Sequence, residues 1–185
     1  MTDVRVNVGC GPHRAPAPWI NVDLVDEGDV HPDVVAREPL RPLAAWDAET
    51  VDAVYLGHVL EHVAWDMVPV FLEHVVWRLR PGGRLCVVGP DVWRTIRGAA
   101  RGEWPWSLVD EVVEAPQDRP GMVGPGGRHQ WNCSEARVAA ALEAAGLAAR
   151  PAAVDPQELA GWPVVSFAVW QCAVVAHKPG SVDAE

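Results

Sequence analysis

The feature that most constrains the fold is a strand-helix-strand pattern in the middle of the chain. Residues 51–56 and 84–88 are short apolar runs, typical of buried strands. Between them, apolar residues recur at helical spacing over residues 66–79; Asp66 is expected to cap this helix, and residues 81–83, Pro-Gly-Gly, to end it. Two strands joined by a helix are normally parallel, and parallel sheets are buried on both faces. The pattern therefore predicts an α/β fold.

The same alternation continues on both sides of this unit. A second helix is predicted after Ser134, which can act as its N-cap, and Gly146 is expected to end it. With 185 residues, of which 49% are hydrophobic, the chain can bury one substantial core. We therefore expect residues 1–185 to form a single domain, with a mostly parallel sheet covered by helices on both faces. The further predicted strands are residues 4–8, 19–24, 34–36, 149–154 and 167–176.

Residues 92–131 interrupt this regular alternation. The segment is rich in Gly, Pro, Trp and Arg, and it is longer than an ordinary connection between two elements. Loops of that length are often functional, so we expect an irregular insertion that forms a lid or part of an acceptor pocket. Residues 178–185 are expected to form a disordered tail.

Charge and hydropathy limit the classes of partner. The formal net charge of −10, with Lys178 as the only lysine, argues against binding to a nucleic acid backbone. No apolar run approaches the roughly 20 residues that span a bilayer, and the first residues do not read as a signal peptide. We therefore expect a cytoplasmic protein without a membrane or nucleic acid partner. Its preference for Arg, Ala, Val, Pro and Gly is typical of a GC-rich bacterial genome.

The cysteines and histidines are the candidate metal ligands of the sequence. The four cysteines lie far apart and form no C-x-x-C pair, so buried free thiols are expected, with neither a disulfide framework nor a zinc cluster. His58, Glu61 and His62 lie close in sequence, but Glu61 and His62 are adjacent and point in different directions. Because no third ligand is evident, no metal is expected; a packed helix entry explains Glu61 and His62 as well as catalysis does.

A glycine turn, Gly9-Cys10-Gly11, follows the first predicted strand, and Asp23 ends the second. Glycine lets a ligand approach the backbone closely, and an acid at a strand end can accept hydrogen bonds from a ribose diol. The dinucleotide fingerprint G-x-G-x-x-G fails because Arg14 occupies its third glycine position. Asp23 also follows too soon for that pattern, and prolines break any helix in residues 15–18. A nicotinamide-dependent oxidoreductase is therefore a disfavoured alternative.

Four motifs in order, VNVGCGP at 6–12, WINVDL at 19–24, HVLEH at 58–62 and LRPGGRL at 79–85, carry a family resemblance. Together they resemble the class I S-adenosylmethionine-dependent methyltransferases, and more narrowly a compact branch of predicted methyltransferases with a short first crossover. The resemblance covers most of residues 4–90 and, more loosely, residues 131–177. It implies a Rossmann-like sheet of seven strands in the order 3-2-1-4-5-7-6, with the seventh strand antiparallel.

The resemblance further implies S-adenosyl-L-methionine as the cofactor. The glycine turn would contact its aminoacyl part, the acid at the end of the second strand would bind the ribose, and the residues after the fourth strand would lie beneath the sulfonium methyl. At the position near the adenine where the family commonly has an acid, this chain has Arg37, so backbone groups nearby would serve instead. The implied cofactor-binding residues are Gly9, Cys10, Gly11, Asp23, Leu24, Pro39, Leu40, Gly57 and His58.

Methyl transfer needs mainly proximity and alignment, with a base only where the acceptor must lose a proton. Two histidines are candidates for a catalytic role. His58 follows a strand end, where it can line the site, and His129 precedes the second helix, where it can act as a general base near neutral pH or be an ordinary surface residue. The predicted function is methyl transfer to an oxygen or nitrogen of a small molecule, with a sugar or a secondary metabolite as candidate acceptors.

Two further expectations concern partners. The chain begins almost at its first strand, without the N-terminal helices that often cover the cofactor in this family, so residues 92–131 or a second subunit must close the site. With ten tryptophans in the sequence, this favours a homodimer. The alternative to an enzyme is a non-catalytic module that keeps the fold and serves as a partner subunit.

Overall fold

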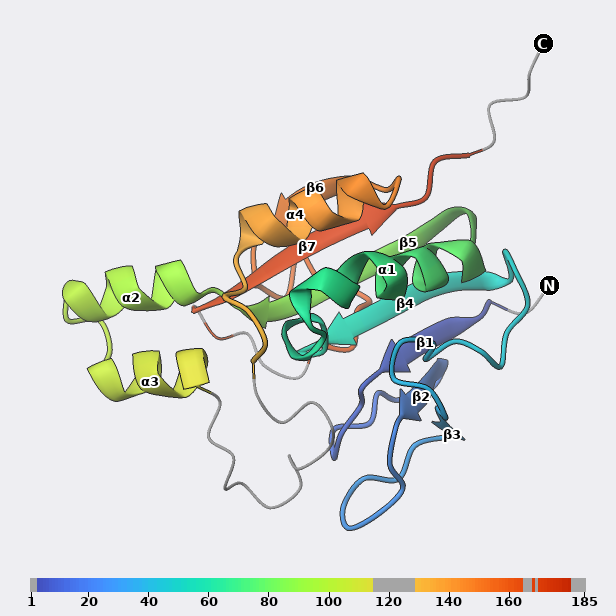
Figure 1. The fold of residues 1–185 in the computed structure, drawn as a ribbon, viewed down its shortest axis with the longest axis horizontal. Coiled ribbons are helices and arrows are strands. Elements are labelled where there is room, and N and C mark those ends of the chain that lie inside the picture. Colours follow the sequence, from blue (N-terminus) through green and yellow to red (C-terminus); the bar gives the residue numbers. More distant parts are fainter. Residues whose placement is uncertain (1–2, 115–128, 165–167, 169, 181–185) are drawn as a thin grey trace.

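The computed structural model describes residues 3–114, 129–164, 168 and 170–180. Its strands form one sheet in the order β3-β2-β1-β4-β5-β7-β6 (Figure 1). Neighbouring strands from β3 to β5 are parallel, and β7 runs antiparallel to both β5 and β6. The expected strand order, with an antiparallel seventh strand, is confirmed. The strands are β1 (Arg5–Val8), β2 (Trp19–Asp23), β3 (Val34–Val35), β4 (Val51–Gly57), β5 (Leu79–Pro90), β6 (Ala148–Ala152) and β7 (Gln171–His177).

Two helices, α1 (Val68–Arg78) and α4 (Glu135–Ala144), pack on one face of this sheet (Figure 1). Their apolar side chains join those of β1, β4, β5 and β7 in the larger hydrophobic core, because every second residue of a strand points to this face. None of the helices in the described ranges combines the length and apolar composition that crossing a bilayer requires.

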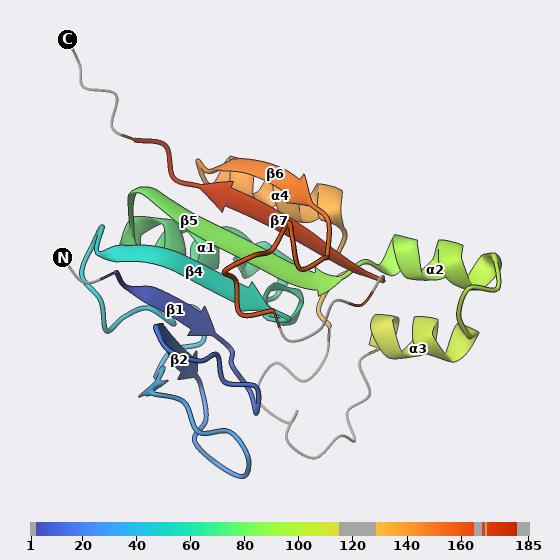
Figure 2. The ribbon, with the colours of Figure 1, turned by 180° about the vertical axis from the view of Figure 1, so that it is seen from behind.

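The opposite face of the sheet, seen from behind in Figure 2, is covered differently from our expectation. A second core joins Ala53 and Tyr55 of β4 to Trp19 and to Leu159 and Trp162, which lie in the connection between β6 and β7. Within the described residues, helices therefore pack on one face only. The strands are still apolar on both sides because a turn-rich connection, rather than a helix, excludes water from the second face.

The connection between β1 and β2 is short and contains no helix, as its prolines predict. The Asn21 side chain, 1% exposed, holds it in place by accepting a hydrogen bond from Ala15 N (2.7 Å) and donating one to Ala15 O (3.0 Å). Asn7 on β1 also donates to Asn21 Oδ1 (3.0 Å). These amide contacts satisfy buried backbone groups that a crossover helix would otherwise satisfy internally.

The start of α1 corrects one expectation. A 3-10 turn, η2 (Trp65–Met67), leads into the helix, and the N-cap residue is Met67, so Asp66 does not cap it. Pro69 lies in the first turn, where its missing N–H costs nothing. The helix ends at Arg78, but residues 81–83 belong to β5, which starts early and contains a register shift opposite Val51.

The second predicted helix is confirmed at both ends. Ser134 is the N-cap of α4 and accepts a hydrogen bond from Arg137 N at 3.5 Å. Gly146, just beyond the helix, has a φ of +85°, the left-handed conformation that favours glycine at a helix end. The two strands that follow the helix differ slightly from prediction: β6 begins one residue earlier, and β7 begins at Gln171, while Phe167 lies outside the described residues.

The expectation of an irregular insertion over residues 92–131 is wrong for its first part. Residues up to 114 form two helices, α2 (Val92–Ala100) and α3 (Trp106–Glu114), which project beyond the carboxyl ends of β4 and β5 (Figures 1 and 2). Asp91 caps α2 by accepting from Arg94 N (2.8 Å), and Trp104 Nε1 donates to Thr95 O (2.7 Å). Residues 115–128 lie outside the described residues.

The expectation of a disordered tail over residues 178–185 is wrong at its first residue. Lys178 Nζ donates to the carbonyl oxygens of Leu79 (2.9 Å) and Val76 (3.2 Å), and the ammonium group also pairs with Glu49 (2.9 Å). These contacts attach residue 178 to the end of α1 and the start of β5. Residues 181–185 lie outside the described residues.

Candidate functional site

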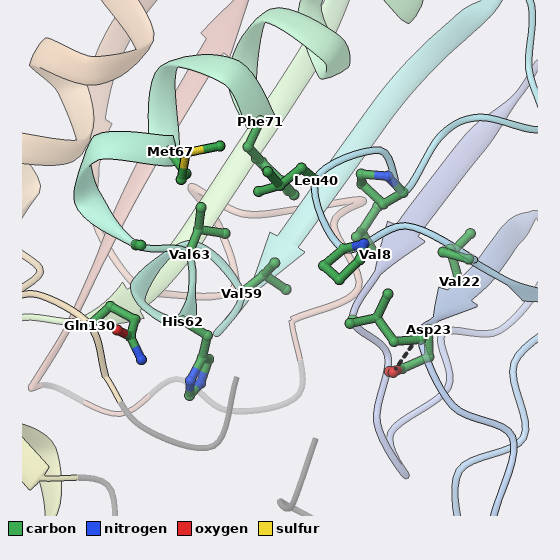
Figure 3. Close-up of a pocket in the computed structure, with 16 residues that line it drawn as sticks. Val8, Val22, Asp23, Leu40, Val59, His62, Val63, Met67, Phe71 and Gln130 are labelled. Carbon is green, nitrogen blue, oxygen red and sulfur yellow. Dashed lines mark hydrogen bonds between the residues drawn. The ribbon is translucent and has the colours of Figure 1, made fainter. Parts of the chain in front are cut away.

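A pocket of about 340 Å³ opens at the carboxyl ends of β1 and β2, facing α1 and the 3-10 turn η1 (Leu60–His62). In open α/β sheets this edge, where strand order reverses, is where ligands bind. Figure 3 shows Asp23 at one end of the pocket and His62 with Gln130 at another, with apolar side chains including Val8, Leu40 and Phe71 between them. The pocket is therefore largely apolar, with polar groups at separate ends.

The glycine turn forms one wall of this pocket. Gly9 has a φ of +67° and lines the pocket, and a Cβ atom there would lie only 2.5 Å from Cγ2 of Val59. Gly11, with a φ of +51°, has open space around it. Gly9 is thus required both by the backbone conformation and by the close approach of η1, whereas Gly11 is required by conformation alone.

Asp23 connects β2 to the glycine turn. Its Oδ2 accepts a hydrogen bond from Gly11 N (2.8 Å), and its Oδ1 accepts one from Leu24 N (2.7 Å; dashed in Figure 3). A carboxylate has about four acceptor positions, so both oxygens can still accept from a ligand hydroxyl. The side chain therefore holds the turn in place and also presents acceptors to the pocket.

Cys10 does not line the pocket and is 5% exposed. Burial, together with the nearby charge of Asp23, raises the pKa of its thiol to about 11. The thiol is therefore protonated at neutral pH and is a packing group, as expected. All four cysteines are buried and free.

Only some of the residues expected to bind the cofactor line the pocket. Arg37, where the family commonly has an acid, is exposed and does not line the pocket; the wall near β3 is apolar instead, with Ala36 and Pro42. Gly9, Asp23, Leu24, Pro39 and Leu40 line the pocket, while Cys10, Gly11, Gly57 and His58 are not among its lining residues.

His58 lies just past β4 with a φ of +56°, unusual for a residue other than glycine. Its Nδ1 is 3.0 Å from Glu61 Oε1, and its Nε2 is 2.6 Å from Nε2 of Gln171. Burial alone would lower the pKa of this imidazole, but the hydrogen bond and charge of Glu61 outweigh burial and raise the pKa. Both ring nitrogens are engaged, and protonation of Nε2 requires the Gln171 amide to turn.

Glu61 is a carboxylate with 0% exposure. Burial alone would raise its pKa, but the hydrogen bond from His58 and the nearby His62 lower the pKa, so Glu61 is ionised at neutral pH. Its second oxygen, Oε2, is buried without a hydrogen-bond partner, in space left open by Gly89, where a Cβ would lie 3.4 Å from it. A buried carboxylate oxygen without a partner is costly, which often marks a functional site.

His129, the other catalytic candidate, lies next to this group. Its ring is 5.1 Å from that of His62, and its Nδ1 is 2.6 Å from the carbonyl oxygen of Val112. Burial lowers the pKa of His129, against the opposing effect of Glu61, so the imidazole is neutral at pH 7. His129 is held there by its neighbours, since Gln130 N donates to Glu61 O (2.7 Å).

One ligand atom each from Glu61, His62 and His129 lies within 4.8 Å of the other two. The sequence argument against a metal rested on the lack of a third ligand near Glu61 and His62, and that premise is wrong. No local signal could have placed His129 beside Glu61 and His62, because this segment reaches η1 only through long-range packing: Trp131 Nε1 donates to Leu60 O, 71 positions away, at 3.1 Å.

No protein-family model matches the chain, and a search of the curated proteins finds no match by sequence. Solved structures do match it. A SAM-dependent methyltransferase from Methanosarcina mazei is 13% identical, with 96% of this chain and 93% of that chain covered and a TM-score of 0.57. A SAM-dependent methyltransferase from Archaeoglobus fulgidus is 14% identical (95% and 86% covered; TM-score 0.56).

A third similar structure is the 1,6-didemethyltoxoflavin-N1-methyltransferase of Burkholderia thailandensis, solved with bound 1,6-didemethyltoxoflavin and S-adenosylhomocysteine. It is 15% identical, with 95% of this chain and 71% of that chain covered, and the TM-score is 0.55. Together with the strand order, these similarities show that the chain has the fold of class I methyltransferases.

Proposed function

We propose that this chain is an S-adenosylmethionine-dependent methyltransferase whose cofactor binds in the pocket beside β1 and β2. The observation that carries the proposal is the pairing of Asp23 with the glycine turn at one edge of that pocket: Oδ2 of Asp23 accepts from Gly11 N while the same side chain lines the pocket. A turn that allows close approach and an acid that can bind a ribose diol are the two features that a nucleoside cofactor needs there.

The pocket provides a position for each part of the cofactor. The aminoacyl part lies against Gly9, and the ribose hydroxyls donate to Asp23. The adenine packs between apolar side chains such as Ala36 and Leu40, with backbone groups near Pro39 in place of the acid replaced by Arg37. Gly57 and His58 do not line the pocket, so we propose that they support it from the end of β4 without contacting the cofactor directly.

The acceptor is an oxygen or nitrogen of a small molecule. The similar B. thailandensis enzyme is an N1-methyltransferase whose structure holds 1,6-didemethyltoxoflavin together with S-adenosylhomocysteine, which supports this class. Between the two histidines, His129 suits proton removal better, because it is neutral at pH 7 and its Nδ1 faces the Val112 carbonyl, leaving Nε2 as the acceptor. His58 is tied at both nitrogens and acts as a positioning residue.

Titration calorimetry of the purified chain tests this proposal. S-adenosylmethionine and S-adenosylhomocysteine should both bind with micromolar affinity, and NADH should not. If neither sulfur compound binds at millimolar concentration, the proposal fails; tight NADH binding would favour the oxidoreductase alternative instead. Binding without turnover, tested with small hydroxyl and amine acceptors, would favour the non-catalytic module.

A further inference from the structure

The side chains of Glu61, His62 and His129 form a cluster. The proposed methyl transfer assigns a role to His129 but none to Glu61 or His62. The three side chains combine one carboxylate and two imidazoles whose ligand atoms lie within 4.8 Å of one another. Two of them belong to η1 and the third to the segment before α4, and Gln130 N and Trp131 Nε1 join these segments by hydrogen bonds to the carbonyl oxygens of Glu61 and Leu60. The cluster therefore rests on a fixed backbone frame.

The hydrogen bonds that these side chains make to their surroundings match those of ligands in a metal centre. Metal-binding histidines usually donate their other ring N–H to a carbonyl or carboxylate, and ligating carboxylates are hydrogen-bonded in turn. His129 Nδ1 lies 2.6 Å from Val112 O, which leaves Nε2 as the ligand atom. With an ion bound there, Nε2 no longer serves as a general base, and the ion would activate the acceptor in its place. Glu61 has His58 on Oε1 at 3.0 Å, while its buried Oε2 has no hydrogen-bond partner.

The ligand chemistry selects the kind of ion. Two imidazoles and one carboxylate suit zinc and similar divalent transition ions, whereas magnesium and calcium prefer oxygen ligands alone. Bonds of about 2.0–2.2 Å set the ligands of a tetrahedral zinc ion about 3.4 Å apart. Modest rotation of the two histidine side chains therefore completes the site.

We infer that Glu61, His62 and His129 bind a zinc-type divalent cation at the edge of the large pocket. His62 lines that pocket, at a different end from Asp23 (Figure 3). Three protein ligands leave a fourth position open, which is the arrangement of zinc sites that bind water or a substrate oxygen. Ion binding itself does not depend on methyl transfer; the further assignment, that the open position receives a hydroxyl acceptor, rests on the proposed function.

The test measures metal binding directly. The metal-free protein is titrated with Co²⁺, whose visible absorption reports four- or five-coordinate binding, and then with Zn²⁺ by calorimetry. One ion per chain should bind with micromolar affinity or tighter, and Zn²⁺ should displace Co²⁺ and raise the melting temperature. No visible band, or more than one weak ion per chain, would overturn the inference.

Variants locate the ion. His129→Ala and His62→Ala should each weaken Zn²⁺ binding by more than the roughly 10- to 100-fold that losing a residue behind a ligand costs, because each variant removes a ligand itself. His31→Ala is the control, because His31 forms an exposed pair with Asp26 that could bind an ion adventitiously. Glu61→Gln tests the carboxylate as a ligand. Because Glu61 is buried, the folding of this variant is checked by circular dichroism. If the variant does not fold, the two histidine variants alone test the site. Unchanged affinity in both histidine variants, or its loss in His31→Ala, contradicts the site.

The same samples are titrated with S-adenosylmethionine, which separates the two proposals. Zinc binding without cofactor binding would refute the proposed function and keep the metal site. Cofactor binding without zinc binding would refute the metal site and leave the proposed function standing. If both zinc and cofactor bind, the visible spectrum of the Co²⁺ protein should change when a hydroxyl acceptor is added. If an acceptor is methylated but leaves the spectrum unchanged, the hydroxyl group does not bind at the open position of the ion.

Discussion

Nδ1 of His58 lies 3.0 Å from Oε1 of Glu61, so a carboxylate with no exposed surface is paired with an imidazole that is more than one-third exposed. The two residues are three positions apart, and the positive φ of His58 turns its ring back toward η1. This pair links the end of β4 to the cluster that contains His62 and His129. Its titration therefore affects both the stability of the fold and the site.

Replacing His58 should destabilise the protein in a pH-dependent way. His58→Gln replaces the imidazole that pairs with the buried Glu61 carboxylate by an amide that carries no charge, at a cost of about 1–3 kcal/mol. The pKa of His58 is raised from 6.5, so its contribution is present below pH 6.5 and is lost as pH rises through the raised value. The pKa of Glu61 is lowered from 4.5, so its contribution is present above pH 4.5 and is lost as pH falls through the lowered value.

The stability difference between wild type and His58→Gln should therefore be largest between pH 4.5 and 6.5 and should shrink on either side. Urea unfolding at several pH values measures it. The control is His13→Gln, at an exposed position on the crossover. A difference that does not vary with pH would show that the pair is not coupled to folding.

Asp23→Ala should weaken S-adenosylmethionine binding. Loss of hydrogen bonds to the ribose, and of the bond that holds Gly11, should cost about 1–3 kcal/mol, or about 5- to 150-fold in Kd by calorimetry. Asp26→Ala is the matched control, because Asp26 is an exposed acid that pairs with His31. Equal affinity of wild type and Asp23→Ala would remove Asp23 from the binding site.

Gly9→Ala should weaken cofactor binding, an effect that backbone strain alone does not explain. A Cβ at Gly9 lies 2.5 Å from Val59 Cγ2, so either Val59 or the glycine turn must shift, whereas a Cβ at Gly28 meets nothing within 4 Å. The two glycines have similar φ values, +67° and +60°, which makes Gly28→Ala a control for backbone strain. Both should lose about 1–2 kcal/mol of stability, and only Gly9→Ala should also lose cofactor affinity. Equal cofactor affinity in the two variants would contradict this role of Val59.

We predict a homodimer, and we propose that its interface includes the exposed tryptophans of α2 and α3. Trp93 on α2 and Trp106 on α3 are 54% and 57% exposed. Light scattering should give twice the 20.0 kDa chain mass, and the double variant Trp93→Ala, Trp106→Ala should give the chain mass itself. Trp77→Ala, an exposed tryptophan on α1, should remain dimeric. A wild-type protein of one chain mass at high concentration would refute the dimer.

Local patterns were sufficient where the structure depends on neighbours in sequence. Alternation and apolar runs predicted most strands, and Ser134 and Gly146 predicted both ends of α4, because caps and periodicity involve only a few residues. The placement of Asp23 beside the glycine turn also followed from sequence, since adjacent parallel strands end at the same edge of the sheet. The helices α2 and α3 were missed because Trp, Gly and Pro conceal their short apolar faces.

Sequence alone therefore determined the sheet, the glycine turn and the acid at its edge. Only the tertiary structure decided what covers the second face of the sheet, since the connection that holds Leu159 carries no helical period. It also decided that His129 lies beside Glu61 and His62. This arrangement depends on Trp131, which packs against η1 and donates a hydrogen bond to it. Contacts between distant segments arise from the packing of the whole core, which no local sequence pattern encodes.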